Sequence, residues 1–364
     1  MRTIRNIWLV LVLFGILFSQ CKKEKEPEPE PEPEQTFYDL NFVLALIDRG
    51  IDTDDDGTIS AKEASVVGYL DVSSCDIKDM RGIGLFVNLA MLYCNGNSLS
   101  SLDLSRNTAL EVLYCNDNQL SKVVVSGAYS LVKLDCHNNQ LTSLNITGNA
   151  LLRELHCENN RIAALDVSGN PVLTDLDCSQ NLLINLDLSG NDSLQYLDCS
   201  QNQLTNLNVA ENVSLVQLFC SSNKLPSIDI SGKSDLAILY CGTNQITSLD
   251  LSGNSALTHL YCQTNLLTIL DVTSNTALNR LGCNGNNLTA LDVSQNTALE
   301  RLACGMNQLS TLNLSQNSSL TQLSISYMPS LLEVCVWTML FPPGDFDLSD
   351  NDSPNYYFTT ECSK

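Results

Sequence analysis

The chain has 364 residues, a formal net charge of −22 and a pI near 4.3. Nucleic acid is held mainly by lysine and arginine side chains that neutralise phosphates, so this acidic chain is not expected to bind it. Apolar residues make up 44% of the chain, whereas 6% aromatic residues and three histidines leave little material for common catalytic sites. We therefore expect a folded protein with a sizeable core that is not an enzyme.

The first 20 residues are typical of an export signal. A positively charged start precedes an apolar run over 7–18, which is short for a membrane-spanning helix. The stretch F-S-Q-C that ends at Cys21 resembles the lipobox of bacterial lipoproteins, although Gln20 stands where a small residue is usual. The resemblance implies that Cys21 is acylated and becomes the mature N-terminus. Plain secretion after cleavage and a retained transmembrane helix are the alternatives.

The segment 21–36 is predicted to be an extended tether. Lysines and glutamates come first, and proline then alternates with glutamate over 27–34. Proline at every second position excludes helices and sheet ladders, which leaves a polyproline-II-like spacer. A lipidated cysteine before such a stalk resembles the tether of surface lipoproteins of the Bacteroidetes group. The resemblance implies a lipid-anchored protein of the outer membrane or cell surface, with secretion as the alternative.

The segment 37–69 is predicted to be a small helical cap that carries a calcium loop. Apolar residues between 40 and 47 have helical spacing, and the segment D-T-D-D-D-G-T-I-S-A-K-E follows them. This segment resembles the loop of EF-hand and dockerin proteins, which implies a Ca²⁺ ion held by oxygen ligands. Dockerins and calcium sensors pair two loops, so a single copy is expected to be structural. The implied ligands are Asp52, Asp54, Asp56, Thr58, Ser60 and Glu63.

Eleven cysteines recur every 21 residues from Cys94 to Cys304, the signature of a stacked-repeat solenoid. The unit reads L-x-x-L-x-C-x-x-N-x-L-x-x-L-D-V/L-S-x-N-x-x and resembles the leucine-rich repeat in a short bacterial form. The resemblance covers about residues 70–340. It implies a β-rich solenoid of the α/β horseshoe type with a parallel sheet on its concave face. We place the solenoid at 70–334 and a C-terminal cap at 335–364.

The cysteine of each repeat is predicted to be a core residue. Alternation through Leu-x-Cys predicts a short strand that points leucine and cysteine inward. Val72 and Ile325 take the cysteine position in the terminal copies, as expected for a buried slot filled by free thiols. Disulfide rungs and a metal site are the alternatives. An odd number of cysteines cannot pair completely, and zinc-type C-x₂-C spacing does not occur. Asn160 and its equivalents are expected to bond backbone groups where the strand ends.

Three further cysteines lie off the 21-residue period. Cys335 and Cys362 flank an aromatic, proline-bearing tail, and in an exported protein we predict a disulfide between them. Cys75 is predicted to be buried in the first coil.

The outward strand positions are the candidate recognition surface. Exposed aromatic patches commonly mark binding sites, but aromatic residues also favour strands and pair across them. Asp135, His156 and Asp177 offer a further alternative, a metal site or acid–base chemistry, for which no nucleophile or pocket is evident. The predicted ligand-binding residues are Tyr93, Tyr114, His156, Tyr196, Phe219, Tyr240, His259 and Tyr261.

Together these features predict a monomeric, surface-displayed recognition or adhesion module. We expect it to bind a protein or a glycan through the concave sheet. The alternative is a dockerin-like, calcium-dependent component of a surface assembly, which a second calcium loop would favour.

Overall fold

The computed structural model describes residues 37–338, 341–342 and 344–362, which all belong to one compact unit, Gln35–Lys364. The predicted export signal, the lipidation site Cys21 and the tether over 21–36 lie outside the described residues. Within the described part of the chain, none of the helices has the length and apolar character needed to cross a membrane.

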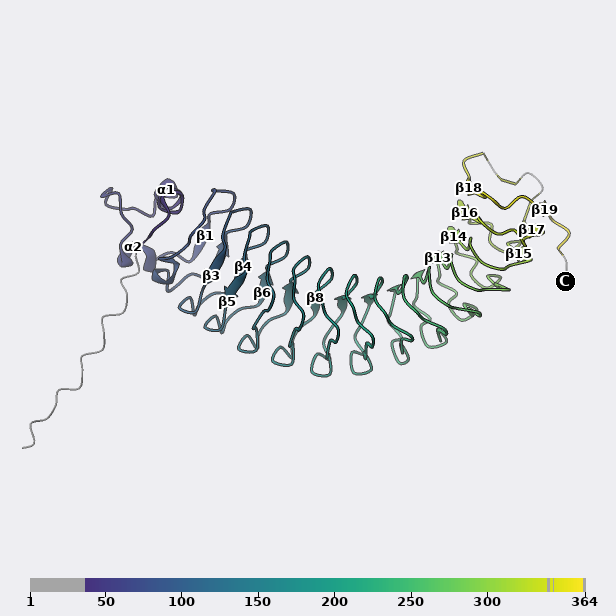
Figure 1. Ribbon diagram of the computed structural model, residues 1–364, viewed down its shortest axis with the longest axis horizontal. Helices are drawn as coiled ribbons and strands as arrows, with labels where there is room; N and C mark the ends of the chain where they lie inside the picture. The colour runs from purple at the N-terminus through teal and green to yellow at the C-terminus, as the bar shows by residue number, and fades with distance from the viewer. Residues whose placement is uncertain (1–36, 339–340, 343, 363–364) are drawn as a thin grey trace, which may run out of the picture. The chain divides into compact units, whose positions relative to one another are not determined.

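The unit is a solenoid of stacked coils, as Figure 1 shows, and this confirms the predicted leucine-rich repeat architecture. Its main sheet has 14 parallel strands of three residues each, and the middle residue of each of these strands up to β16 is buried. Neighbouring strands pair without a shift, so that Leu155 lies beside Leu176. In chain order the strands are β1 (Tyr69–Asp71), β2 (Met91–Tyr93), β4 (Val112–Tyr114), β6 (Lys133–Asp135), β7 (Glu154–His156), β8 (Asp175–Asp177), β9 (Tyr196–Asp198), β10 (Gln217–Phe219), β11 (Ile238–Tyr240), β12 (His259–Tyr261), β13 (Arg280–Gly282), β14 (Arg301–Ala303), β16 (Gln322–Ser324) and β18 (Asp347–Ser349).

Two short sheets lie on the return side of the coils. One has two strands and the other has three, all parallel. In Figure 1 the main sheet follows the inner side of the arc of coils, and the short sheets lie on its outer side. The main sheet therefore forms the concave face, as predicted. The return strands are β3 (Ser101–Asp103), β5 (Lys122–Val124), β15 (Thr311–Asn313), β17 (Glu333–Cys335) and β19 (Tyr357–Thr359).

Helices occur only at the start of the described chain: α1 (Leu40–Asp48), α2 (Ala61–Ser65) and the 3₁₀ turn η1 (Ile83–Leu85). The side chain of Asp39 caps α1 by accepting hydrogen bonds from two backbone N–H groups of its first turn. The same carboxylate accepts the backbone N–H of Lys78 at 2.6 Å, which ties the helix to the first coil. Phe42 and Leu46 are fully buried, so α1 covers apolar surface at this end of the solenoid.

The cysteine ladder is part of the core. All eleven cysteines from Cys94 to Cys304 have no exposed surface and are free thiols. Val72 and Ile325, which take the same position in the terminal coils, are equally buried. The prediction of a core position is confirmed, whereas Cys75 differs from expectation. It is partly exposed, because it lies at the turn after β1, where its Sγ is 3.5 Å from Nη2 of Arg49.

The asparagine after each cysteine ties neighbouring coils together. The Asn160 side chain donates to the carbonyl oxygens of Cys136 and Cys157 at 3.0 and 3.1 Å and accepts the N–H of Leu141 at 2.9 Å. It thereby satisfies three backbone groups at a point where the sheet ladder has ended. This arrangement recurs along the array, as expected for the predicted bonding.

A second asparagine ladder, on the return side, was not predicted. Asn170 has no exposed surface, and its Nδ2 donates to the carbonyl oxygens of Ile146 and Asn149 at 3.1 and 2.8 Å. The position could have been recognised from the second asparagine of the repeat unit, which recurs in most copies. Ala128 and Lys233 replace this asparagine in two coils.

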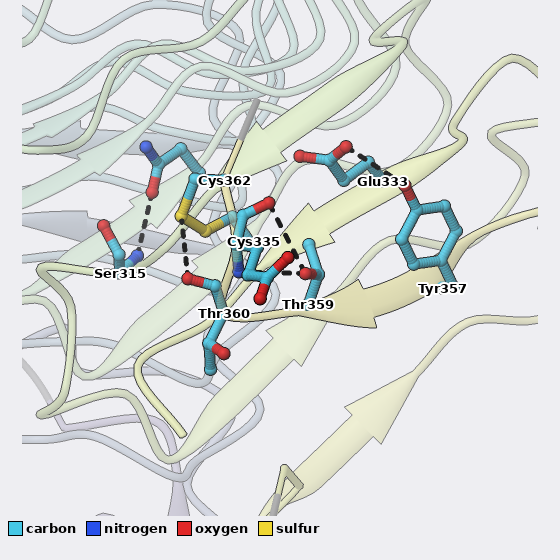
Figure 2. The surroundings of a disulfide bond; sticks show 9 residues. Ser315, Glu333, Cys335, Tyr357, Thr359, Thr360 and Cys362 are labelled. Atoms are coloured by element: carbon cyan, nitrogen blue, oxygen red, sulfur yellow. Dashed lines mark hydrogen bonds between the residues drawn. A yellow bond between two sulfur atoms is a disulfide. The ribbon is translucent and has the colours of Figure 1, made fainter. Parts of the chain in front are cut away.

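The C-terminal segment continues the coils rather than leaving them. Strand β18 pairs with β16, and β19 pairs with β17, so both sheets extend into the region predicted to be a non-repetitive cap. Figure 2 shows the bond that joins Cys335 to Cys362, whose Cα atoms lie 5.3 Å apart. Nearby, the Tyr357 hydroxyl donates to Oε2 of Glu333 at 3.2 Å.

Candidate binding surface and calcium loop

The concave face carries two outward rows of side chains. Because the middle residue of each main-sheet strand up to β16 points into the core, its first and third residues face outward. We call these the first row and the third row. The third row is the outward position predicted from the repeat, while Tyr196 and His259 belong to the first row. The third row contains Tyr93, Tyr114, Asp135, His156, Asp177, Asp198, Phe219, Tyr240 and Tyr261.

The predicted aromatic residues form two zones on this face. In the first zone, the rings of Tyr93 and Tyr114 stack at 4.9 Å with an interplanar angle of 9°. Tyr69 of β1 extends this zone, with its ring 5.6 Å from that of Tyr93. It was missed because it lies in the irregular copy that opens the array, where the cysteine is absent.

The second aromatic zone runs over strands β9 to β12. Consecutive ring centroids of Tyr196, Phe219, Tyr240 and Tyr261 lie 5.5, 4.8 and 4.6 Å apart. The ring of Tyr261 then lies over Gly282, where a Cβ atom would be only 2.6 Å from its Cδ1. The rings are half-buried because each packs against the next. Cross-strand pairing therefore accounts for part of their burial.

Between the aromatic zones lies an acidic zone on strands β6 to β9. Lys133 pairs with Glu154 at 2.6 Å, and Nε2 of His156 lies 3.1 Å from Oδ1 of Asp175. The hydrogen bond to Asp175 is the main reason that the pKa of His156 lies above its usual value, although partial burial opposes this. Asp177 lies between His156 and Asp198 in the third row and pairs with neither of them.

The residues of the proposed acid–base alternative are neighbours in the third row, but their side chains pair with other residues. His156 lies beside Asp175, whereas Asp135 lies 2.6 Å from Nδ1 of His137. Among the described residues, the one group of His, Cys, Asp or Glu side chains able to hold a metal ion is in the N-terminal loop. The geometry of Asp135, His156 and Asp177 therefore provides no support for a catalytic or metal site on the sheet.

The N-terminal loop brings together part of the predicted calcium ligand set. One oxygen each from Asp52, Asp54 and Glu63 lies within 4.8 Å of the others. Asp56 is the main reason that the pKa of Asp54 is raised, because repulsion between close carboxylates disfavours the charged form. A cation at this point would relieve that repulsion, so the residues present fit Ca²⁺.

Glu63 has a second role in the same loop. Its Oε2 accepts the N–H of Ser60 at 2.9 Å, and the Ser60 hydroxyl accepts the N–H of Glu63, which is a capping box for α2. Its Oε1 accepts the N–H of Thr53 at 2.6 Å. These bonds, led by that from Ser60, lower the pKa of Glu63 to about 2. Asp56 accepts hydrogen bonds from Thr58, so the other predicted ligands lie in the same turn.

Comparison with known proteins gives structural relatives only. No protein-family model matches the chain, and no curated protein matches it. The functional domain of InlJ from Listeria monocytogenes, which includes a cysteine ladder, is 33% identical, with 76% of this chain and 70% of that domain covered and a TM-score of 0.58. The internalin InlF of the same species is 21% identical, with 87% and 96% covered and a TM-score of 0.74.

A plant protein has a similar fold at lower identity. The leucine-rich repeat ectodomain of the receptor kinase GASSHO1/SCHENGEN3 from Arabidopsis thaliana was solved in complex with CASPARIAN STRIP INTEGRITY FACTOR 2. It is 19% identical, with 77% of this chain and 42% of that chain covered and a TM-score of 0.57. This likeness concerns the fold alone.

Proposed function

Because the chain belongs to the leucine-rich repeat proteins, we propose that it is a non-catalytic recognition module that binds a protein partner through its concave sheet. Stacked repeats create extended concave surfaces of this kind. The observation that carries the proposal is the aromatic zone of β9 to β12, where four rings follow one another on the outward face of a chain that is poor in aromatic residues.

The arrangement of the rings favours a protein over a glycan. A sugar ring packs best on the open face of an aromatic ring, but Tyr93 and Tyr114 turn their faces toward each other. Tyr261 has Tyr240 on one side and Gly282 on the other. Aromatic side chains that are already paired in this way suit contacts with apolar side chains of a protein.

Binding of the purified whole chain to protein and glycan arrays tests this function. We expect capture of proteins that weakens at least about tenfold in a Tyr240→Ala/Tyr261→Ala variant, since aromatic anchors dominate interface energies. The matched control is Ile184→Ala/Ile269→Ala, which removes exposed apolar side chains from the return side. Equal binding by all three folded proteins would show that the aromatic zone is not the binding surface.

We further propose that the module is displayed at the cell surface by a lipid on Cys21, with the segment 21–36 as a spacer. A palmitate analogue fed to expressing bacteria should label the wild-type chain and not a Cys21→Ser variant. Secretion of unlabelled wild-type protein into the medium would contradict the anchor.

Calcium binding by the N-terminal loop is a separate proposal. The convergence of Asp52, Asp54 and Glu63 supports it, together with the raised pKa of Asp54. Titration calorimetry with CaCl₂ should show one site in the wild-type chain and none in an Asp54→Asn/Glu63→Gln variant. Absence of heat in the folded wild-type protein would contradict the proposal. A thermal melt with and without Ca²⁺ would then show whether the ion stabilises the cap.

A further inference from the structure

Two carboxylates face each other across neighbouring strands at the border of the acidic and second aromatic zones. Asp177 of β8 and Asp198 of β9 are register partners in the third row, so their backbones are about 4.8 Å apart. Each carboxylate accepts the backbone N–H of a serine two residues later, at 3.0 Å from Ser179 and 2.8 Å from Ser200. These bonds hold both carboxylates in place on the outward face.

Neither member of this pair forms an ion pair within the described chain, because His156, which lies beside Asp177 in the third row, pairs instead with Asp175. Every ion pair recorded on the acidic zone involves other carboxylates, namely those of Asp117, Asp135, Glu154, Glu158 and Asp175. Like charges directly opposite each other destabilise a sheet. The third-row neighbours of the pair are His156, which already pairs with Asp175, and the uncharged Phe219, so the two carboxylates keep a net negative charge.

The pKa values of Asp198 and Tyr196 reflect this negative charge. Burial first, and then Asp177, raise the pKa of Asp198 above its usual value. Burial and the adjacent carboxylates, led by Asp198, also raise the pKa of Tyr196. The Tyr196 phenol therefore stays protonated, so that it presents a hydroxyl donor and a neutral ring beside the two carboxylates.

Aromatic rings border the carboxylate pair on its C-terminal side. Tyr196 lies in the first row of the same strand as Asp198, and Phe219 lies beside Asp198 in the third row. Their ring centroids are 5.5 Å apart. A lysine or arginine side chain can pair with a carboxylate and contact a ring at the same time. We define the cation site by these four residues: Asp177, Asp198, Tyr196 and Phe219.

We propose that the protein partner places a lysine or arginine side chain in the cation site, next to an apolar segment that lies on the second aromatic zone. The proposal rests on the proposed function and adds the chemistry of the partner to it. The opposite end of the aromatic zone carries Arg280 and Arg301 in the first row. A basic partner segment is repelled there, so the cationic part of the partner lies toward β8 and the apolar part toward β12.

The test uses the whole chain and a fluorescein-labelled hexa-arginine peptide as the probe, followed by fluorescence anisotropy near physiological salt. The variant is Asp177→Asn/Asp198→Asn. The matched control is Asp229→Asn/Asp250→Asn, which removes the same charge from neighbouring repeats on the return side. Those two aspartates also accept the N–H of a serine two residues later, at 2.9 Å each. The control therefore separates the cation site from the general attraction of a chain with a net charge of −22.

We expect the concave variant to weaken peptide binding about tenfold and the control to weaken it less than about twofold. The concave variant should also melt at the wild-type temperature or above it, because it removes repulsion. A structural role for the two aspartates would instead lower its melting temperature. Equal losses in both variants would overturn the proposal, because attraction would then be non-specific.

The outcome is distinguishable from failure of the proposed function. One outcome is that a protein captured on the array binds less tightly to the Tyr240→Ala/Tyr261→Ala variant but equally well to Asp177→Asn/Asp198→Asn. In that case the concave sheet binds the partner, and the proposal of a cation site is wrong. If neither set of changes alters the affinity for the partner, the proposal that the partner binds the concave sheet is wrong.

Discussion

The side-chain amide of Asn254 donates a hydrogen bond to the backbone carbonyl of Lys233, one coil earlier, at 3.0 Å. Lys233 occupies the equivalent position of its own coil, but its Nζ is buried without a recorded hydrogen-bond partner. In the coils that carry asparagine at this position, its side-chain amide donates to two carbonyl oxygens of preceding coils, as that of Asn170 does. Lys233 is thus a break in the return-side ladder.

Replacing Lys233 by asparagine should stabilise the solenoid. The change restores two hydrogen bonds to carbonyl groups and removes a buried amine, which we expect to raise the free energy of unfolding by about 1–3 kcal/mol. Urea denaturation measures this gain. The control is Lys224→Asn, which removes the same charge from an exposed site. An equal or lower stability of the Lys233→Asn variant would show that the lysine is well accommodated.

The same lysine should make stability depend on pH. Burial lowers the pKa of Lys233 in the folded chain below its ordinary value of 10.5. The unfolded chain then binds more protons between the folded-state pKa and 10.5, so stability rises with pH in that window. The difference in unfolding free energy between Lys233→Asn and the wild type should therefore shrink as the pH rises from 7 toward 10. A pH-independent difference would mean that the pKa is not lowered.

Much of this architecture follows from the period of the sequence, and the exceptions have physical causes. The period of Cys157 and its equivalents predicts the strands, their inward side and the parallel stacking. It does not predict that the tail around Tyr357 continues both sheets, because three-residue strands there lack the leucine and cysteine pattern. Backbone hydrogen bonds to β17, rather than side-chain periodicity, place that strand.

The candidate site was predictable to a similar extent. The outward position of Tyr240 follows from its place between a buried leucine and a buried cysteine. The pairing of His156 with Asp175 was not predictable, because both first-row and third-row side chains reach across strands and their rotamers decide which of them meet. For the same reason, the repeat pattern alone could not show that neither Asp177 nor Asp198 forms an ion pair within the described chain.

The asparagines that follow the strands should contribute more to the free energy of unfolding than the exposed asparagines of the repeats. Replacing Asn160 by alanine leaves two carbonyl groups and one N–H group without their side-chain partner, which we expect to cost about 2–4 kcal/mol. Asn185→Ala, at an exposed position of the next repeat, should change stability by less than about 0.5 kcal/mol. Chemical denaturation of both variants gives the comparison. Similar losses would indicate that water replaces the amide at position 160.

The ladder thiols should be unreactive in the folded protein. Burial raises the pKa of Cys241 to about 12 and that of Cys157 well above its ordinary range. Iodoacetamide should therefore label the partly exposed Cys75 and spare the eleven ladder cysteines, at pH 7 and at pH 9 alike. Peptide mapping by mass spectrometry identifies the labelled sites, and unfolding in guanidinium should expose all of them. Labelling of a ladder cysteine in the native protein would show that the coils open locally.

The bond between Cys335 and Cys362 should hold the last coil in place. It closes a loop over a sequence separation of 27 residues, for which chain entropy gives a stabilisation of about 3–4 kcal/mol. The Cys335→Ser/Cys362→Ser variant should therefore exchange its β17 and β19 amide hydrogens much faster than the wild type, while strands near β8 are unaffected, because each repeat contacts only its neighbours. Cys75→Ser is the control for loss of a thiol. Intact mass should rise by two hydrogens on reduction of the wild type, and an unchanged mass would show that the two cysteines are not bonded.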